Sequence, residues 1–436
     1  MAGCAIGSLA TVAAGASSRG REARLSLHLA DGLLARTAGG RTQEGQALLR
    51  LAGRTGPGLL GTVAAHAAVM RLTEIDDIHR PTAVTVGAMT VPPALAFAGA
   101  DTRPGELLDA LHAGQEVALR LALAAGGARL LTRGQWPSLI VAPLAAATVC
   151  ARLLRLPPER MRHAMALAIA QVTRGPGRPL GARTGRWWLF GEAVRGGCGA
   201  ALAAADGIDG DPGLLDGGWL QAIGGELAAP AQLTATDSLS DELSIKPHPS
   251  AKQALAAVHG LRTLLAEERI APEGVTAVEL HVPPAYAGML AREAPQASRL
   301  ASLVNAGWQL ALAALRPELL DDVAREGWPD DPRLAAFADR VRVQADPSLD
   351  ALYPRAYPAR LLVEADGRRH ERLVTDSPGD PALAFDAGQL HDKALRLLGP
   401  HTPFHAFEAA LRLPQEPEAV ATLRAAFGYA PGDRLP

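Results

Sequence analysis

The stretch IKPHPSAKQALAAVHGLRTLLAEERIAPEGVTAVELHV, residues 245–282, joins two regions of the chain with different hydrophobic periods. Within residues 251–267 the apolar side chains recur every three or four positions, which is typical of an amphipathic helix. Within residues 278–282 valine and leucine alternate with polar residues, which is typical of a half-buried strand. The change of period predicts a domain boundary near residue 245.

The region before this stretch is predicted to be helical. Residues 104–125 carry leucines at spacings close to 3.6, and residues 158–172 begin with Pro-Glu, a favoured helix start, and continue with apolar residues four apart. Alanine-rich segments between them have small side chains that permit close helix packing. We expect helices from the N-terminus to about residue 240.

The region after the stretch mixes strands with helices. Valines alternate at 341–343, and residues 359–374 are typical of a hairpin that turns at Asp366-Gly367, a dipeptide that tolerates positive φ. A last helical stretch is expected at 404–427. The sequence therefore predicts a mainly α protein, with a large all-helical domain and a smaller α+β domain. The predicted domains are residues 1–244 with 400–436 for the helical one, and 245–399 for the α+β one.

Composition excludes several classes of partner. Of 436 residues, 48% are apolar and 20% charged, and the formal net charge is −2. Basic residues are scattered, so we expect no nucleic-acid partner and no anionic membrane surface. No apolar run reaches the roughly 18 residues that span a bilayer, and arginines follow the apolar opening segment instead of preceding it as in a signal peptide. A cytoplasmic protein is expected.

Cysteine and lysine are both scarce. Three cysteines are too few and too dispersed for a disulfide framework or a zinc site. Among 43 Lys and Arg residues only Lys246, Lys252 and Lys393 are lysines. Because arginine supplies the remaining positive charge, each lysine is a candidate for a specific role, although chance remains the simpler explanation for any one of them.

Short motifs follow one another along the chain in a characteristic order. They are Glu-Ile-Asp-Asp-Ile-His at 74–79, Val-Pro-Pro-Ala-Leu-Ala at 91–96, His-Ala-Gly-Gln-Glu-Val at 112–117, Trp-Pro-Ser at 136–138, the segment 183–197 and Ile-Lys-Pro-His-Pro at 245–249. This order resembles the MmgE/PrpD superfamily, which includes 2-methylcitrate dehydratase, cis-aconitate decarboxylase and iminodisuccinate epimerase. The resemblance covers nearly the whole chain, including the strands.

The resemblance implies a helical domain with a smaller α+β domain, a homodimer, and chemistry without metal or cofactor. No Gly-rich phosphate loop follows a predicted strand, so no nucleotide or flavin is expected either. The resemblance places four segments around one pocket at the domain junction. These segments are residues 74–85, 136–138, 183–188 and 245–249.

Several positions depart from the family pattern. A histidine expected after the Asp-Asp pair is missing from Ala83-Val84-Thr85, and the histidine of a His-Pro-Pro-Ser motif is replaced by Trp136. Arg186 stands where the family has lysine, and Trp308 where it has tyrosine, while Lys246 is retained. The departures imply a shifted substrate, which we expect to belong to a specialised biosynthetic pathway.

Lys246, Asp77 and His79 are the candidates for catalysis. A buried carboxylate can have its pKa raised into the range of a general base, and a desolvated ammonium can exchange a proton near neutrality. The alternative for the acidic segment is that its carboxylates cap backbone amides or pair with Arg71 and Arg80. For Lys246 the alternative is an ordinary surface lysine.

A second set of candidates is expected to bind the substrate. Arginine matches a carboxylate in bidentate fashion, and a tryptophan on the wall would make the cleft more apolar. The alternatives are an exposed basic turn for the arginines and simple core filling for the tryptophan. The predicted substrate-binding residues are Arg183, Arg186, Trp136, Ser138, Thr85 and His248.

The predicted function is that of a lyase or isomerase, of dehydratase, decarboxylase or epimerase type, acting on a small carboxylate-bearing molecule. Such chemistry needs a base that removes a proton α to a carboxylate and cations that hold the developing negative charge. Two alternatives remain open. The fold can host an enzyme of another class, such as a cyclase, or a non-catalytic binding protein that lost the chemistry.

Overall fold

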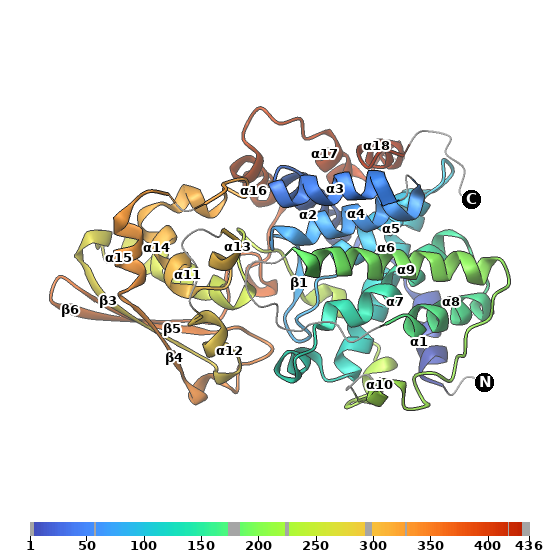
Figure 1. The fold of residues 1–436 in the computed structure, drawn as a ribbon, viewed down its shortest axis with the longest axis horizontal. Helices are drawn as coiled ribbons and strands as arrows, with labels where there is room; N and C mark the ends of the chain where they lie inside the picture. Colours follow the sequence, from blue (N-terminus) through green and yellow to red (C-terminus); the bar gives the residue numbers. More distant parts are fainter. Residues whose placement is uncertain are drawn as a thin grey trace.

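The computed structural model describes residues 4–55, 58–172, 184–222, 226–292, 299–327, 329–416 and 418–429. These residues form a mainly helical molecule with two large, separate hydrophobic cores. Figure 1 shows the two parts side by side, a helical bundle built from the blue and green elements and a smaller part with a sheet built from the orange ones. The predicted fold class is confirmed.

The larger core lies among helices whose axes approach closely because glycine and alanine line their contacts. A Cβ atom at Gly197 of α9, for example, would lie 2.1 Å from the carbonyl oxygen of Pro143 on α7. Proline occupies the first position of α6, α7 and α8 and favours helix initiation there. The helices of this part are α1 (Ala5–Gly15), α2 (Glu22–Gly40), α3 (Gln43–Thr55), α4 (Leu59–Leu72), α5 (Gly87–Phe97), α6 (Pro104–Ala124), α7 (Pro137–Leu153), α8 (Pro158–Ala170), α9 (Gly185–Ala205), α10 (Trp219–Ala222), α16 (Ala387–Leu398), α17 (His405–Arg412) and α18 (Ala419–Ala426).

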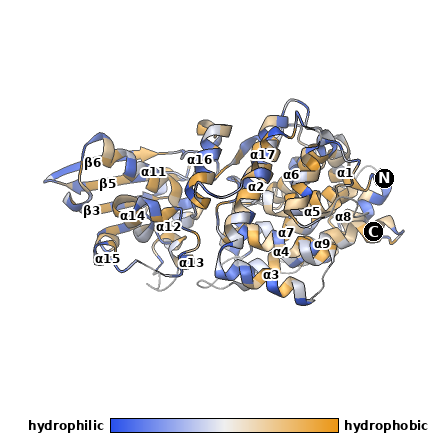
Figure 2. Cartoon of the chain, turned by 90° about the horizontal axis from the view of Figure 1, so that it is seen from above, coloured by the Kyte–Doolittle hydropathy of each residue, from blue (hydrophilic) through white to orange (hydrophobic). Residues whose placement is uncertain are grey.

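The smaller core lies between a four-stranded sheet and its covering helices. The sheet has the order β4-β3-β5-β6, in which β3 and β4 are parallel and the other neighbours antiparallel. The predicted hairpin turns at Asp366 and Gly367, whose φ angles are 51° and 72°. The elements of this part are α11 (Lys252–Glu267), β3 (Val275–Val282), α12 (Pro284–Leu290), α13 (Arg299–Ser302), α14 (Ala306–Leu315), α15 (Pro332–Ala338), β4 (Val341–Ala345), β5 (Ala359–Ala365) and β6 (Arg368–Val374). Figure 2 shows hydrophobic segments in both parts of the ribbon.

A short two-stranded ladder is the exception to the expected all-helical first region. Strand β1 (Ile78–His79) pairs antiparallel with β2 (Leu243–Ser244), with Ile78 opposite Ser244 and His79 opposite Leu243. The ladder is only two residues long, but it joins segments that are far apart in the sequence. It brings the motif at 74–79 beside the motif at 245–249.

The predicted domain boundaries near residues 245 and 400 stay predictions. Helix α16 contributes Leu390, Ala394, Leu397 and Leu398 to the larger core, together with residues of α17 and α18. We therefore propose that the return to the helical domain lies before α16, earlier than the sequence pattern indicates.

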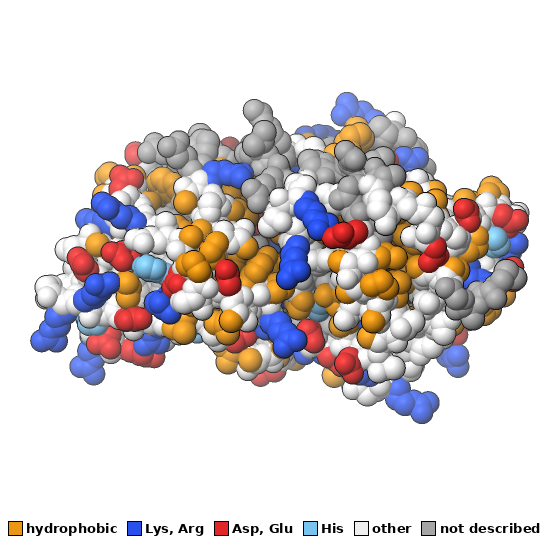
Figure 3. All heavy atoms as spheres, turned by 90° about the horizontal axis from the view of Figure 1, so that it is seen from below, with side chains coloured by type: hydrophobic (Ala, Val, Ile, Leu, Met, Phe, Trp, Pro, Cys, Tyr) orange, Lys and Arg blue, Asp and Glu red, His pale blue; other side chains and the backbone are white. Residues whose placement is uncertain are grey.

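The surface shows charges of both signs. On the face drawn in Figure 3, basic and acidic side chains are interspersed with hydrophobic ones. In the part of the chain that the structure describes, no helix combines the length and the hydrophobicity needed to span a membrane.

Candidate functional site

Three basic side chains converge on the carboxylate of Glu74, just after α4. Arg186 Nη2 donates to Glu74 Oε1 at 3.0 Å, and Arg71 Nη1 lies 3.0 Å from Oε2. Lys246 Nζ donates to Oε2 at 3.2 Å. Burial raises the pKa of Glu74, but Arg71, Lys246 and Arg186 outweigh it, so that the pKa lies well below its ordinary range. Glu74 is therefore an anion held by three cations.

Asp76 is the second carboxylate of this group. Its Oδ1 accepts a hydrogen bond from Arg71 Nη1 at 3.0 Å, whereas its buried Oδ2 has no hydrogen-bond partner among the residues that the structure describes. Burial raises the pKa of Asp76 to about 7; Arg71 and Lys246 oppose this shift, and Glu74 adds to it. The carboxyl group thus gains and loses its proton near neutral pH. We call Glu74, Asp76, Arg71, Arg186 and Lys246 the Glu74 cluster.

The backbone around Glu74 is fixed by two buried lysines. Glu74 has a φ of 57°, in the left-handed region that a glutamate seldom adopts. Lys246 Nζ donates to its carbonyl oxygen at 3.1 Å, and Lys393 Nζ donates to the next carbonyl, that of Ile75, at 2.9 Å. The β1–β2 ladder, which begins four residues later, sets the distance between the segments of Glu74 and Lys246.

Trp136 forms an aromatic wall of the cluster. It precedes α7 and is buried, and its ring lies 4.8 Å from the guanidinium carbon of Arg186 and 5.7 Å from that of Arg71. The centroid of the Trp136 ring also lies 5.6 Å from the centroid of the Phe190 ring. Burial lowers the pKa of Arg186 to about 10, with Glu74 opposing the shift, so that Arg186 stays charged at neutral pH.

Asp77, a predicted catalytic residue, is engaged in holding the start of α5. Its Oδ1 accepts a hydrogen bond from the backbone N–H of Gly87 at 2.9 Å, and its Oδ2 lies 3.5 Å from His28 Nδ1. A Cβ atom at position 87 would approach both carboxylate oxygens to 3.3 Å. These contacts correspond to the alternative interpretation, in which an acid of this segment caps backbone amides.

His79, the other acid-base candidate of this segment, is fully buried on β1. Its Nδ1 lies 2.9 Å from Thr82 Oγ1, and its Nε2 lies 3.6 Å from Glu242 Oε2. The imidazole therefore contacts Thr82 and Glu242. Among the described residues, no hydrogen bond or ion pair joins it to Glu74 or Lys246.

The remaining predicted substrate-binding residues are Thr85, Ser138, His248 and Arg183. The backbone N–H of Thr85 donates to Ser138 Oγ at 3.2 Å, and both residues are buried beside the start of α7, close in sequence to Trp136. His248 is buried, and its pKa is lowered to about 3 by burial and by nearby Arg262 and other cations, so the ring is neutral. Arg183 lies outside the described residues.

All three lysines are buried, contrary to the surface alternative. Lys246 is 1% exposed, Lys393 is fully buried, and Lys252 is 4% exposed. Lys393 Nζ binds Asp31 Oδ1 at 2.5 Å, and Lys252 Nζ binds Asp380 Oδ1 at 2.6 Å. The scarcity of lysine in the sequence was a signal for buried ion pairs.

Sequence reasoning did not assign a role in the site to Glu74, Asp76 or Arg71. The acidic motif contained both carboxylates, but their approach to Lys246 depends on the β1–β2 ladder, which is too short to leave a sequence pattern. The pairing of Arg71 with the acids was anticipated, as a purely structural alternative.

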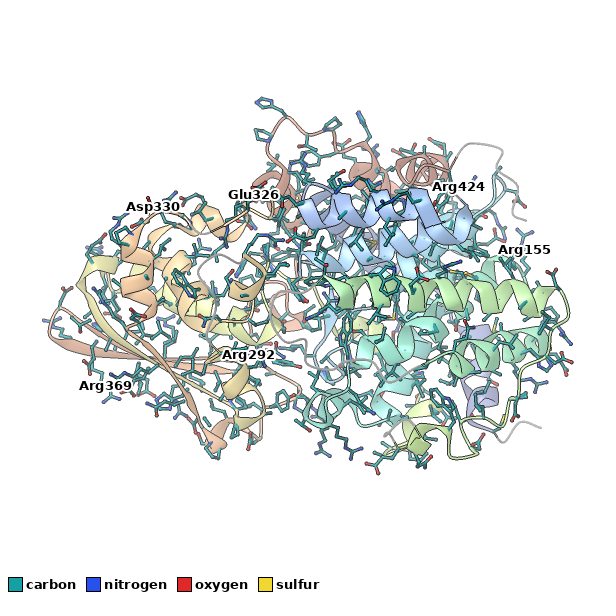
Figure 4. All side chains as sticks on the ribbon, viewed as in Figure 1. Arg155, Arg292, Glu326, Asp330, Arg369 and Arg424 are labelled. Atoms are coloured by element: carbon teal, nitrogen blue, oxygen red, sulfur yellow. The ribbon has the colours of Figure 1, made fainter. Side chains whose placement is uncertain are left out.

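A cavity of about 360 Å³ lies elsewhere, among Glu106, Asp109, Arg152 and Arg155. Figure 4 shows Arg155 at the end of the helical part that faces away from the sheet, remote from β1 as labelled in Figure 1. No group of three or more His, Cys, Asp and Glu side chains among the described residues could hold a metal ion. The Glu74 cluster itself is closed: Glu74 is only 13% exposed.

The fold and the Glu74 cluster define a two-part, mainly helical protein with a buried cation site where its two motif segments meet. Residues 45–226 match the MmgE/PrpD N-terminal domain, and residues 248–412 match the MmgE/PrpD C-terminal domain. The chain belongs to the MmgE/PrpD family. No curated protein matches it. The family comprises enzymes of dehydratase and lyase type, which supports a lyase or isomerase activity in broad terms.

Proposed function

We propose that the protein is a lyase or isomerase that removes a proton α to a carboxylate of a small substrate, without metal or cofactor. The observation that carries the proposal is the Glu74 cluster, in which Arg186, Arg71 and Lys246 surround one position for a carboxylate. Cations in a buried site stabilise the enolate-like charge that develops when the proton leaves.

Asp76 is the proposed base. Its Oδ2 is buried and unpaired within the described part of the chain, and its pKa of about 7 leaves much of the carboxylate ionised at neutral pH. The carboxylate would take the proton from the α carbon, and the electron pair of the broken C–H bond would delocalise into the substrate carboxylate. Departure of a β hydroxyl, which takes up a proton and leaves as water, gives a dehydratase, and return of a proton from solvent to the opposite face gives an epimerase. Lys246 would donate a hydrogen bond to the substrate carboxylate. Arg186, which lies beside Trp136, would stabilise the negative charge of the same carboxylate.

A non-catalytic binding protein is the second candidate. It is favoured by one observation: the two histidines of the family pattern are missing, with Ala83-Val84-Thr85 at one position and Trp136 at the other. A protein that only binds an anion would need the cations but not the titrating Asp76, so proton exchange separates the two candidates.

The test follows proton exchange in D2O. A panel of di- and tricarboxylates is incubated with the wild-type protein, and loss of the α proton or formation of product is followed by NMR. With the converted compound, Lys246→Met should lower kcat/KM at least tenfold, because a lost hydrogen bond to a charged group costs about 1.5–3 kcal/mol.

The matched control is Arg195→Met, which deletes a half-exposed cation paired with Glu192 on α9, the same helix as Arg186. It should keep wild-type kcat/KM. Wild-type kinetics of Lys246→Met on a converted compound would refute the assignment of the site. Binding of a carboxylate by the wild-type protein without any exchange would favour the second candidate.

A further inference from the structure

The Glu74 cluster resembles a carboxylate-binding site that is already filled. Arg186, Arg71 and Lys246 approach both oxygens of the Glu74 carboxylate from 3.0 to 3.2 Å, which is the arrangement expected around a bound carboxylate ligand. Resting on the function proposed above, we infer that Glu74 is an internal occupant of the carboxylate position, and that a ligand carboxylate binds by displacing it.

The surroundings allow the side chain of Glu74 to leave while its backbone stays. The carbonyl oxygens of Glu74 and Ile75 are each held by a buried lysine, at 3.1 and 2.9 Å, and this fixes the left-handed conformation at Glu74. The side chain of Glu74 is 13% exposed, against 1% for Asp76, so it is the carboxylate of the cluster with access to solvent. Rotation of its side chain opens the three cations without moving β1.

Three buried donors and acceptors next to the carboxylate position are available to a larger ligand. Asp76 Oδ2, Arg71 Nε and Arg186 Nε are buried and have no hydrogen-bond partner among the described residues. An internal competitor acts at an effective concentration in the millimolar range or above, so a simple monocarboxylate that offers only what Glu74 offers competes poorly with it at concentrations below that range. Glu74 therefore selects for carboxylates that carry further polar groups able to reach these atoms.

The experiment removes the internal carboxylate and offers acetate in its place. Unfolding temperatures of wild-type protein and Glu74→Ala are measured at neutral pH with increasing sodium acetate, against sodium chloride at the same ionic strength. We expect acetate to raise the unfolding temperature of Glu74→Ala by about 1–3 °C, because a ligand that binds only the folded state stabilises it. The wild-type protein should respond to the two salts alike.

Two further variants make the test specific. Glu74→Ala combined with Lys246→Met should show a weakened acetate response, because one of the cations of the position is gone. If Glu74→Ala does not fold, Glu74→Ala with Arg186→Met keeps the charge balance of the cluster and leaves Arg71 and Lys246 to bind acetate. A similarly weakened acetate response is expected from it.

Equal responses of wild-type and Glu74→Ala protein, or no response in either Glu74 variant, would overturn the inference. So would an acetate response of Glu74→Ala that Lys246→Met leaves at full size. The outcome is independent of turnover: failure of the exchange test above with a clear acetate response in Glu74→Ala would refute the proposed reaction and keep the carboxylate position. Exchange activity without an acetate response in Glu74→Ala would keep the proposed reaction and refute the inference that Glu74 occupies a carboxylate position.

Discussion

Lys246 and Lys252 are both buried and both bind a carboxylate, but the two ion-pair networks differ in completeness. At Lys252 every polar atom is satisfied. Asp380 Oδ1 accepts from Ser244 Oγ at 2.7 Å and lies 2.6 Å from Lys252 Nζ, and Oδ2 accepts from Lys252 Nζ and from the backbone N–H of Ser377, each at 2.8 Å. Burial raises the pKa of Asp380, but Lys252 and then Arg80 outweigh it, so that the pKa lies below its ordinary value. We call this group the Asp380 network.

The Glu74 cluster has the same kinds of side chain, but three of its buried atoms have no partner in the described ranges of the chain, namely Asp76 Oδ2, Arg71 Nε and Arg186 Nε. A fully satisfied buried network fixes one conformation, whereas each unpaired buried group needs another explanation, such as a ligand. The comparison teaches that burial of a lysine does not by itself identify a site. The unpaired atoms beside Lys246 distinguish the Glu74 cluster from the Asp380 network.

The Asp380 network also clamps the chain next to Lys246. The backbone N–H of Ile245 donates to the carbonyl oxygen of Gly379 at 2.9 Å. Gly379 has a φ of 87°, and a Cβ atom there would lie 1.9 Å from the carbonyl oxygen of Ile245. The structural network therefore holds the segment after β2 from which Lys246 reaches Glu74.

The largest expected effect is a loss of stability when the Asp380 network is broken. Lys252→Met leaves the buried Asp380 without its closest cation, and breaking a buried pair from one side costs about 3–5 kcal/mol. Lys246→Met should cost less, because Glu74 keeps Arg71 and Arg186. Urea unfolding of both variants measures the two free energies. A larger loss in Lys246→Met than in Lys252→Met would contradict the division into a structural and a binding network.

The second prediction concerns pH and Asp76. Its pKa is raised from 3.8 to about 7 by burial, so the folded protein binds this proton more tightly than the unfolded chain. The resulting contribution to the free energy of unfolding is fully present below about pH 4 and is lost as pH rises through about 7. Asp76→Asn removes this dependence, and we expect it to gain ~1–3 kcal/mol relative to wild type between pH 5 and pH 8.

The measurement is urea unfolding of both proteins across this pH range, with Asp380→Asn as the matched control. The pKa of Asp380 is lowered, so its contribution is present above its ordinary pKa and lost only on acidification. Asp380→Asn should therefore show no gain between pH 5 and pH 8. A constant difference between wild type and Asp76→Asn would show that Asp76 does not titrate in this range and would remove it as the proposed base.

The fold could be predicted from the sequence further than the site could. Helical spacing, alternation at β3 and the Asp366-Gly367 turn are local patterns, and each is present where it was expected. The ordering of motifs also identified Lys246. The two-residue β1–β2 ladder has no local signature, and it decides that Lys246 meets Glu74, while the carboxylate of Asp77 binds the N–H of Gly87. The completeness of a buried network depends on distances that only the folded chain defines.

The smallest expected effect sharpens the role of Trp136 in the Glu74 cluster. Its ring lies 4.8 Å from the guanidinium carbon of Arg186, and tryptophan binds cations more strongly than phenylalanine does. Trp136→Phe also leaves space in the core, so the single substitution cannot separate packing from the cation contact. A double-mutant cycle with Arg186→Met isolates the interaction, for which we expect a coupling energy of about 0.5–1 kcal/mol.

Trp188 provides the control for this cycle. It lies two residues after Arg186 on α9 and is 45% exposed. Within the described part of the chain, no cation–π contact joins its ring to Arg186. Trp188→Phe with Arg186→Met should give additive changes in the free energy of unfolding. If the Trp136 pair were additive as well, Trp136 would be simple core filling, as the alternative interpretation of the sequence holds. A coupling confined to Trp136 would instead place its ring in the same interacting unit as the cations around Glu74. The Asp380 network of Lys252, Asp380, Ser244 and Ser377 contains no such aromatic ring.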